Sequence, residues 1–294
     1  MQEKNNFWVP LLIIFLIILD IFVWRTIFFS APNNNLEAYF LNVGQGDAEM
    51  VILSKGVKIL IDGGPDKSIL RELSSVLSPF DRYIDLIILS HAQTDHFTGL
   101  IDVLKRYQVG AFIYNGQDGT AKSWQELLKT LSANKIPIIV LSEGDKINYL
   151  ESDLKIISPG QKFLFSNDFN QTTLVGLLDS QGVRILFTGD IDAEVEEYLA
   201  QKYNLDIDVL KVAHHGSKYS SSEKFLQAVK PKMAVIEVGK NSYGHPTVNA
   251  LNRLAAVGAQ IFRTDKDGLV KLVIGNRQID IFKKNILQAT NLAR

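Results

Sequence analysis

An almost continuous apolar segment, residues 7–29, lies near the start of the chain and is interrupted by Pro10, Asp20 and Arg25. A helix needs about 20 apolar residues to cross the hydrocarbon core of a membrane. The twelve apolar residues between Leu11 and Val23 each favour insertion by about 0.3–0.6 kcal/mol, which outweighs a cost of about 2.5–3.5 kcal/mol for Asp20. The pattern therefore predicts that residues 1–29 anchor the chain in the cell membrane with a single span.

A cleaved signal peptide is the alternative interpretation of this segment. The apolar core of a signal peptide normally has about 7–15 residues and is followed by small residues before the cut. Here Phe28 and Phe29 precede Ser30, which favours an uncut anchor. The amino terminus and Lys4 before the span, weighed against Arg25 near its end, favour a large domain outside the cytoplasm. The absence of cysteine fits an extracytoplasmic domain without disulfides.

Residues 30–36 form a short polar linker, and residues 37–294 then alternate between two apolar patterns. Short apolar runs predict strands near residues 38–43, 48–53, 57–61, 84–89, 111–114, 137–141, 153–158, 172–178, 183–187, 207–212, 232–238, 259–263 and 269–274. Amphipathic stretches predict helices near residues 67–77, 96–107, 122–133, 192–202, 222–229 and 247–257. Strands that alternate with helices imply sheets covered by helices, and the length supports one large domain.

Candidate metal ligands follow four of the predicted strands. All five histidines lie in three short clusters behind apolar runs, and two aspartates occupy matching positions. These residues are His91, Asp95 and His96 after residues 84–89, Asp190 after residues 183–187, His214 and His215 after residues 207–212, and His245 after residues 232–238. Taken alone, a histidine after a strand is more often a solvated or hydrogen-bonded residue than a ligand. Because imidazoles and carboxylates recur at four strand ends, we predict a site for zinc, manganese or iron.

Several short segments surround these residues in a fixed order. They are residues 41–48 (LNVGQGDA), 60–64 (LIDGG), 90–96 (SHAQTDH), 188–190 (TGD), 214–217 (HHGS), 244–246 (GHP) and 262–265 (FRTD), the last followed by Gly268. This order resembles the metallo-β-lactamase superfamily and, more narrowly, the extracytoplasmic hydrolase domain of ComEC-type competence (DNA-uptake) proteins. The resemblance extends from about residue 36 to about residue 281 and is more specific for the fold than for the substrate.

The resemblance implies a four-layer αββα sandwich, an α+β or α/β fold, with two divalent ions, zinc or manganese, at one end. His91 matches a ligand of the first metal, whereas Asp95 and His96 match ligands of the second. Asp190 matches the carboxylate that bridges the two metals. His245 follows the strand whose end holds the last ligand of the second metal.

Two departures from the superfamily pattern affect the first metal. Gln93 stands where the superfamily has histidine and where the competence-type branch often has aspartate, and its neutral oxygen predicts a weaker first position. The histidine expected between the two aspartate ligands is missing, and Asn170 lies in the matching stretch, as in the competence-type branch. We therefore expect one of His214 and His215 to complete the first metal. The other is then free to contact the scissile group or to carry a proton.

Four further polar residues are assigned supporting roles. Asp62 matches an acid that orients the ligand loop, with a turn acid before two glycines as the alternative. Asp47 ends a tight Gly-Gln-Gly-Asp turn and is expected at the rim of the active site. Ser217 and Lys218 suit an anionic substrate, and the alternative is a polar helix entry with Ser222 as its N-cap.

The predicted chemistry is metal-assisted hydrolysis, with catalytic roles for Asp95, Asp190 and His215. Two ions bridged by Asp190 and a water would lower the pKa of that water toward about 7. The competence-type resemblance implies a phosphodiesterase or nuclease acting on DNA outside the cell, although a formal net charge of −1 gives no basic footprint for tight nucleic-acid binding. One predicted span does not make a DNA-conducting channel, so a separate competence channel protein is the expected partner.

Two other functions are compatible with the same residues. Hydrolysis of a small ester, a phosphorylcholine-like group or a β-lactam would use the same metal site, because specificity lies in the loops. A metal-poor binding module is favoured by Gln93 and the missing histidine, and it is opposed by the ligand-type side chains that remain.

Overall fold

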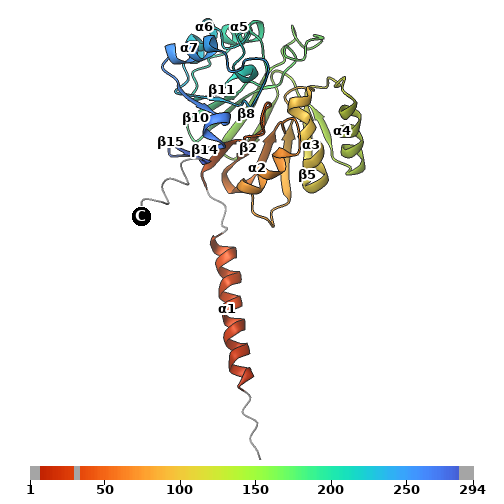
Figure 1. The fold of residues 1–294 in the computed structure, drawn as a ribbon, viewed down its shortest axis with the longest axis vertical. Helices are drawn as coiled ribbons and strands as arrows, with labels where there is room; N and C mark the ends of the chain where they lie inside the picture. The colour runs from red at the N-terminus through yellow and green to blue at the C-terminus, as the bar shows by residue number, and fades with distance from the viewer. Residues whose placement is uncertain (1–6, 30–33, 285–294) are drawn as a thin grey trace, which may run out of the picture.

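The computed structural model describes residues 7–29 and 34–284 of the chain. Two β-sheets lie face to face, with helices on the outer side of each (Figure 1). The first sheet has eight strands, in the order β15 (Gln278–Lys283), β14 (Val270–Gly275), β1 (Leu36–Phe40), β2 (Glu49–Ile52), β3 (Lys58–Ile61), β4 (Tyr83–Ile88), β5 (Gln108–Tyr114) and β6 (Ile138–Val140). The second has seven, in the order β13 (Gln260–Arg263), β12 (Met233–Ile236), β11 (Val209–Lys211), β10 (Val183–Phe187), β9 (Val175–Ser180), β8 (Ser152–Ser158) and β7 (Lys146–Tyr149).

Six helices complete the outer layers. Those on the first sheet are α2 (Ser68–Val76), α3 (Thr94–Arg106) and α4 (Lys122–Ala133); those on the second are α5 (Ala193–Lys202), α6 (Glu223–Val229) and α7 (Val248–Ala256). The alternation along β1 shows how one strand serves two layers, because Ala38 and Phe40 face the second sheet whereas Tyr39 faces the helices. Between the sheets, the rings of Phe40 and Phe187 stack with centroids 6.3 Å apart. The four-layer αββα arrangement predicted from the sequence is confirmed.

Parallel strands set the position of the loops that carry chemistry. Strands β3 to β6 run parallel to one another, as do β10 to β13. Parallel strands that are covered on both faces are almost entirely apolar, and their carboxyl ends all lie at the same end of the sheet. The loops that follow β3, β4, β10, β11 and β12 therefore gather at one end of the sandwich.

The N-terminal helix α1 (Trp8–Phe29) stands apart from the two sheets (Figure 1). Its segment Trp8–Arg25 is long and apolar enough to cross a membrane, and none of it is buried against the rest of the protein. The predicted N-terminal apolar helix is confirmed as a candidate membrane span. Residues 30–33 of the predicted linker and residues 285–294 of the predicted domain lie outside the described residues.

Several short elements were not predicted from the sequence. They are β7, β15, the one-turn helix α8 (Thr264–Asp267) and two 3-10 turns, η1 (Ser54–Gly56) and η2 (Ala213–Gly216). The hairpin between β14 and β15 turns through Asn276 and Arg277, whose φ angles are 52° and 64°. A left-handed turn without glycine does not show the usual sequence pattern of a hairpin, so the sequence does not predict β15.

Glu196 in α5 fixes the loop that follows η2. Its carboxylate accepts hydrogen bonds from the backbone N–H groups of Ser221 and Ser222, the latter at 2.8 Å. Burial raises the pKa of Glu196 from its ordinary value of 4.5 to about 7. Between these two pKa values, the folded state holds a proton that the unfolded chain has lost. This group therefore stabilises the fold below about pH 4.5, and that contribution is lost as the pH rises to about 7.

We expect Glu196→Gln to remove this pH dependence, which amounts to roughly 1.4 kcal/mol per pH unit in that window. The amide oxygen still accepts a hydrogen bond, so the loop keeps its anchor. Urea unfolding between pH 4.5 and 8 measures the change, with the exposed neighbour Glu197→Gln as the matched control. A pH dependence that is the same in wild type and Glu196→Gln would contradict the assignment.

Candidate metal centre

Segments from both sheets deliver polar side chains to the same end of the sandwich. Asp62 follows β3, His91 lies in the loop between β4 and α3, and Asp190 follows β10. His214 and His215 lie in η2, directly after β11, with φ angles of 52° and 54°. Two consecutive left-handed residues that are not glycine are uncommon, and outside hairpin turns such backbone strain clusters at functional sites. The turn is tied to the Asp190 loop, because His214 N–H donates to the carbonyl of Gly189 at 3.1 Å.

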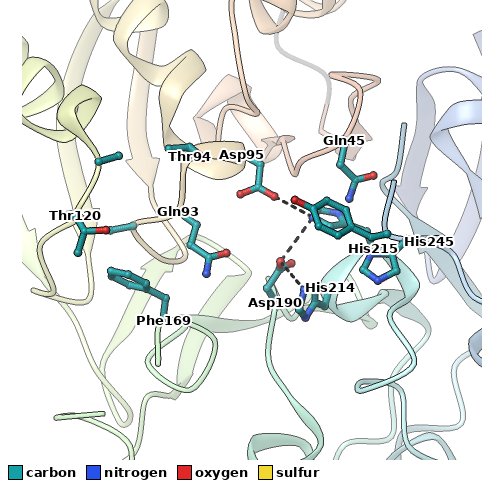
Figure 2. A pocket seen from close by; sticks show the side chains of 13 residues that line it. Gln45, Gln93, Thr94, Asp95, Thr120, Phe169, Asp190, His214, His215 and His245 are labelled. Atoms are coloured by element: carbon teal, nitrogen blue, oxygen red, sulfur yellow. Dashed lines mark ion pairs between the residues drawn. The ribbon is translucent and has the colours of Figure 1, made fainter. Parts of the chain in front are cut away.

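Four side chains converge closely enough to share one ion. Asp95, His96, Asp190 and His215 each offer one ligand atom, and these atoms all lie within 4.8 Å of one another. Nε2 of His96 lies 3.5 Å from Oδ2 of Asp190, and Nε2 of His215 lies 3.5 Å from Oδ2 of Asp95 and 3.6 Å from Oδ2 of Asp190. Figure 2 shows Asp95, in the first turn of α3, and Asp190, in the loop after β10, pointing toward His215.

The hydrogen-bonding state of these atoms fits a divalent ion. Nε2 of His96, Nε2 of His215 and Oδ1 of Asp190 are buried and have no hydrogen-bond partner among the described residues. Buried polar atoms are nearly always hydrogen-bonded, so three such atoms in one group indicate a ligand. Two imidazole nitrogens and two carboxylate oxygens are a donor set that suits zinc or manganese.

Asp62 and Ser90 orient two of the histidines. Oδ2 of Asp62 lies 2.7 Å from Nδ1 of His96 and 2.6 Å from the hydroxyl of Ser90, and Oδ1 accepts from Ser90 N–H at 2.7 Å. The Ser90 hydroxyl in turn lies 3.0 Å from Nδ1 of His91. With Nδ1 occupied in this way, Nε2 of each ring is turned toward the centre. Asp62 therefore lies behind the ligand loop.

His215 is held from behind by two groups. Its Nδ1 lies 2.8 Å from the carbonyl oxygen of Glu237 and 3.2 Å from Oδ1 of Asp47. A carbonyl only accepts, so Nδ1 carries a hydrogen and Nε2 faces the other ligands. Asp47, which was expected at the rim, is instead fully buried beneath the ligand group.

The residues predicted for the first metal are less tightly gathered. Nε2 of the buried His91 lies 3.2 Å from Oε1 of Gln93, and His91 is absent from the four-ligand group. His215 lies with the predicted ligands of the second metal, which leaves His214 as the candidate from the pair for the first. Nε2 of His214 is 3.9 Å from Oδ2 of Asp190, and its ring centroid is 5.6 Å from that of His245. His245 is half-buried and is also outside the four-ligand group.

Three buried charged residues at this centre were not predicted from the sequence. Lys211, at the end of β11, forms an ion pair with Asp47, donates to the carbonyl of Gly189 at 3.1 Å and lies 3.9 Å from Oδ1 of Asp190. Glu49 and Glu237 lie close to Asp47 below the ligands, and these three side chains are buried, as is that of Lys211. The signal was present, because a lysine and a glutamate interrupt apolar strand runs at residues 211 and 237.

Electrostatics divides these groups into charged and neutral forms. Burial opposes the charge of Asp190, but His215 and His96 outweigh it and hold the pKa of this carboxyl well below its usual range. Lys211, followed by His215, likewise overcomes burial and lowers the pKa of Asp47. Burial together with the charge of Asp47 raises the pKa of Glu49 to about 8. Burial and the nearby His96 lower the pKa of His91 to about 3, so this ring is neutral.

A cavity of about 580 Å³ opens over the ligand group. Its lining consists of Gln45, Ala92, Gln93, Thr94, Asp95, Thr120, Ala121, Phe169, Asp190, His214, His215, Tyr243 and His245. In Figure 2, Phe169 and Thr120 lie on one side of Asp190, and Gln45 and His245 lie on the other.

Three residues predicted near the substrate are not part of this lining. Ser217 is buried and its hydroxyl accepts from the backbone of Tyr219, while Lys218 is exposed and covers the ring of Tyr219. The contacts match the alternative interpretation, a polar helix entry, because Ser222 caps α6. Asn170 lies next to the cavity residue Phe169, with its side-chain oxygen buried.

The sequence of this chain is similar to those of competence proteins from two bacteria. ComE operon protein 3 of Bacillus subtilis (strain 168) is 29% identical over 260 residues, covering 82% of this chain and 33% of that protein. Competence protein ComA of Neisseria gonorrhoeae is 29% identical over 250 residues, covering 84% of this chain and 33% of that protein. The chain thus spans about a third of the length of these curated relatives.

The fold and a family model point to the same superfamily. The crystal structure of the metallo-beta-lactamase fold protein YhfI from Bacillus subtilis superimposes with a TM-score of 0.56 at 10% identity, covering 80% of this chain and 99% of that one. At this identity the likeness concerns the fold alone. The sequence model of the metallo-beta-lactamase superfamily matches residues 42–239.

Proposed function

Because the chain belongs to the metallo-beta-lactamase superfamily, we propose that it is a membrane-anchored, metal-dependent phosphodiesterase that cleaves DNA. Membership of this superfamily and similarity to competence-type proteins, both predicted from the sequence motifs, are confirmed by the comparisons. The observation that carries the proposal is the convergence of Asp95, His96, Asp190 and His215, all but His96 of which line an open cavity. Competence concerns DNA uptake, which makes DNA the first substrate to test.

The side chains divide the work in this proposal. When bound, divalent ions lower the pKa of water toward about 7 and polarise a phosphoryl oxygen. Asp95, His96, Asp190 and His215 would hold the second metal of the superfamily pattern, and His91, Asp190 and His214 would hold the first metal more weakly, because Gln93 adds only a neutral oxygen.

Proton transfer needs a group that reaches the substrate. His214 lines the cavity with a half-buried ring, and its Nε2 lies 3.9 Å from Oδ2 of Asp190. With only the second metal bound, this imidazole would be free to deliver a proton to the leaving oxygen, whereas with both metals bound it would act as a ligand. His215 is fixed by Glu237 and Asp47, so its role is to orient and hold.

The domain division and topology belong to the same proposal. Residues 1–29 anchor the chain, residues 30–36 link it, and residues 37–294 form the hydrolase domain outside the cytoplasm. In this proposal a separate channel protein conducts the DNA, and the candidate span holds the hydrolase beside it. The anchor keeps the hydrolase at the membrane surface, where such a channel would open.

Metal removal and replacement test the function. We expect the full-length protein in detergent to lose phosphodiester hydrolysis on chelation and to regain it with manganese or zinc. Metal content should reach nearly two ions per chain, with one released before the other during dialysis. The activity is measured on DNA, on a generic phosphodiester and on a chromogenic lactam, and the bound ions by mass spectrometry.

The other outcomes separate the alternatives. Hydrolysis of the lactam alone would assign the site to a small substrate. Chains that take up one ion or none and stay inactive after metal addition would identify a binding module on a hydrolase fold.

A further inference from the structure

Two aromatic side chains flank the candidate metal centre. Phe169 and Tyr243 both line the cavity, and they come from loops far apart in the sequence. Phe169 lies on the side of Asp190 opposite His245 (Figure 2). Tyr243 belongs to the His245 side, because its ring lies 5.7 Å from the His245 ring at an interplanar angle of 30°. The ligand group is thus bordered by an aromatic ring on each side.

The ring of Tyr243 is exposed although its loop is fixed. Oδ1 of Asn241 accepts from the backbone N–H groups of Tyr243 at 3.1 Å and His245 at 3.0 Å. The amide of Asn241 also donates to the carbonyls of Gly239 and His245, both at 2.9 Å. Yet 74% of Tyr243 is exposed. An aromatic ring held open to solvent by an ordered backbone can bind a flat partner with little loss of conformational entropy.

The loop of Phe169 is ordered as well. Its carbonyl accepts from the hydroxyls of Thr172 and Thr173, each at 3.1 Å. The Phe169 ring packs partly against the core of the first sheet, and its remaining surface faces the cavity. Both rings are therefore presented from defined positions.

The cavity is not suited to binding the phosphates of duplex DNA through basic side chains. None of the described residues that line it is a lysine or an arginine. Proteins that grip duplex DNA use such side chains on the phosphates, with a basic groove along the backbone. Apart from its aspartates and histidines, the wall offers aromatic faces and neutral polar groups, so it can hold the bases while ions bound to the ligand group would hold the phosphate.

We propose that Tyr243 and Phe169 form a base-stacking subsite and that the enzyme acts on single-stranded DNA. Bases in a duplex already stack on one another, so their faces are available only when the strand is unpaired. Stacking on an aromatic ring tolerates any base, which suits a site without sequence-specific donors. The assignment of DNA as the ligand rests on the proposed function, but base stacking itself requires no metal and no turnover.

Binding and turnover of one oligonucleotide test this subsite. We expect Tyr243→Ala to weaken binding of a fluorescent single-stranded oligonucleotide roughly five- to hundredfold in the full-length, chelated protein, the loss of one stacked base. Tyr243→Phe keeps the ring and should bind like wild type. Tyr219→Ala is the matched control, since 66% of Tyr219 is exposed and it lies outside the cavity. In the metal-loaded wild type, the single strand should be cleaved faster than the same sequence as a duplex or as an abasic strand.

Each result has a distinct meaning. Equal binding by wild type and Tyr243→Ala, or equal cleavage of single strand, duplex and abasic strand, would overturn the subsite while leaving the phosphodiesterase intact. Binding that depends on Tyr243 without cleavage of any phosphodiester would keep the subsite and reject the proposed function. No binding of the single strand by wild type would reject the subsite whatever the turnover.

Discussion

Substitution of Asp190 by alanine is expected to abolish metal-dependent phosphodiester hydrolysis, lowering kcat/KM by at least about 10³-fold, or about 4 kcal/mol in the barrier. Asp190 is buried where both sheets meet, and its Oδ2 lies within 3.9 Å of ring nitrogens of His96, His214 and His215. Its loss removes an anionic ligand that both proposed metal positions share. Kinetics with added manganese or zinc measure the loss of activity, metal content measures the loss of the ligand, and thermal melting shows whether the fold survives.

The fold should survive this substitution, because His215 and Lys211 keep Asp47 as a partner. Asp280→Ala, which removes an exposed carboxylate on β15, is the matched control and should leave activity and metal content unchanged. Turnover that persists in Asp190→Ala with unaltered metal content would remove Asp190 from the site.

Substitution of Lys211 by methionine is expected to lower the free energy of unfolding of the metal-free protein by about 3–5 kcal/mol. The ammonium group is fully buried and compensates Asp47 directly and Asp190 at 3.9 Å. Methionine fills similar space but leaves both carboxylates without this cation in a setting of low polarity. Chemical denaturation of the chelated protein in detergent measures the loss.

Two further variants show whether charge is the cause. Lys105→Met breaks an exposed pair with Glu126 and should cost less than about 1 kcal/mol. Adding Asp47→Asn to Lys211→Met should recover part of the stability, because one uncompensated charge is gone. A loss below about 1 kcal/mol in Lys211→Met, or no recovery in the double variant, would argue against a buried ion network.

Sequence pattern predicted the fold to the extent that the apolar periodicity was regular. The strand near residues 183–187 matches β10, because four of its five residues are apolar and the run ends abruptly at a polar loop. Strand β15 was not predicted because Phe282 and Lys283 reverse its polar and apolar alternation and it follows a turn without glycine. Edge strands bury little, so their sequences carry a weak signal.

Prediction of the site had a different limit. Histidines and aspartates at strand ends are visible in the sequence, and the structure gathers Asp95, His96 and Asp190 at one point. The relative directions of His214 and His215 depend on two left-handed backbone angles, which spacing does not encode. Lys211 was read as part of an apolar strand, although a lysine among buried neighbours itself signals a buried carboxylate.

The contribution of ligands by both sheets has a consequence for how long the folded domain lasts. Asp95 and His96 follow β4 of one sheet, whereas Asp190 and His215 follow strands of the other. An ion held by all four would cross-link the two halves and close a long loop of chain, and at a thousand times its dissociation constant it would add about 4 kcal/mol to stability. With the domain outside the cytoplasm, as proposed, proteases would attack chains that open, and the lifetime of the domain would then follow the local supply of divalent ions.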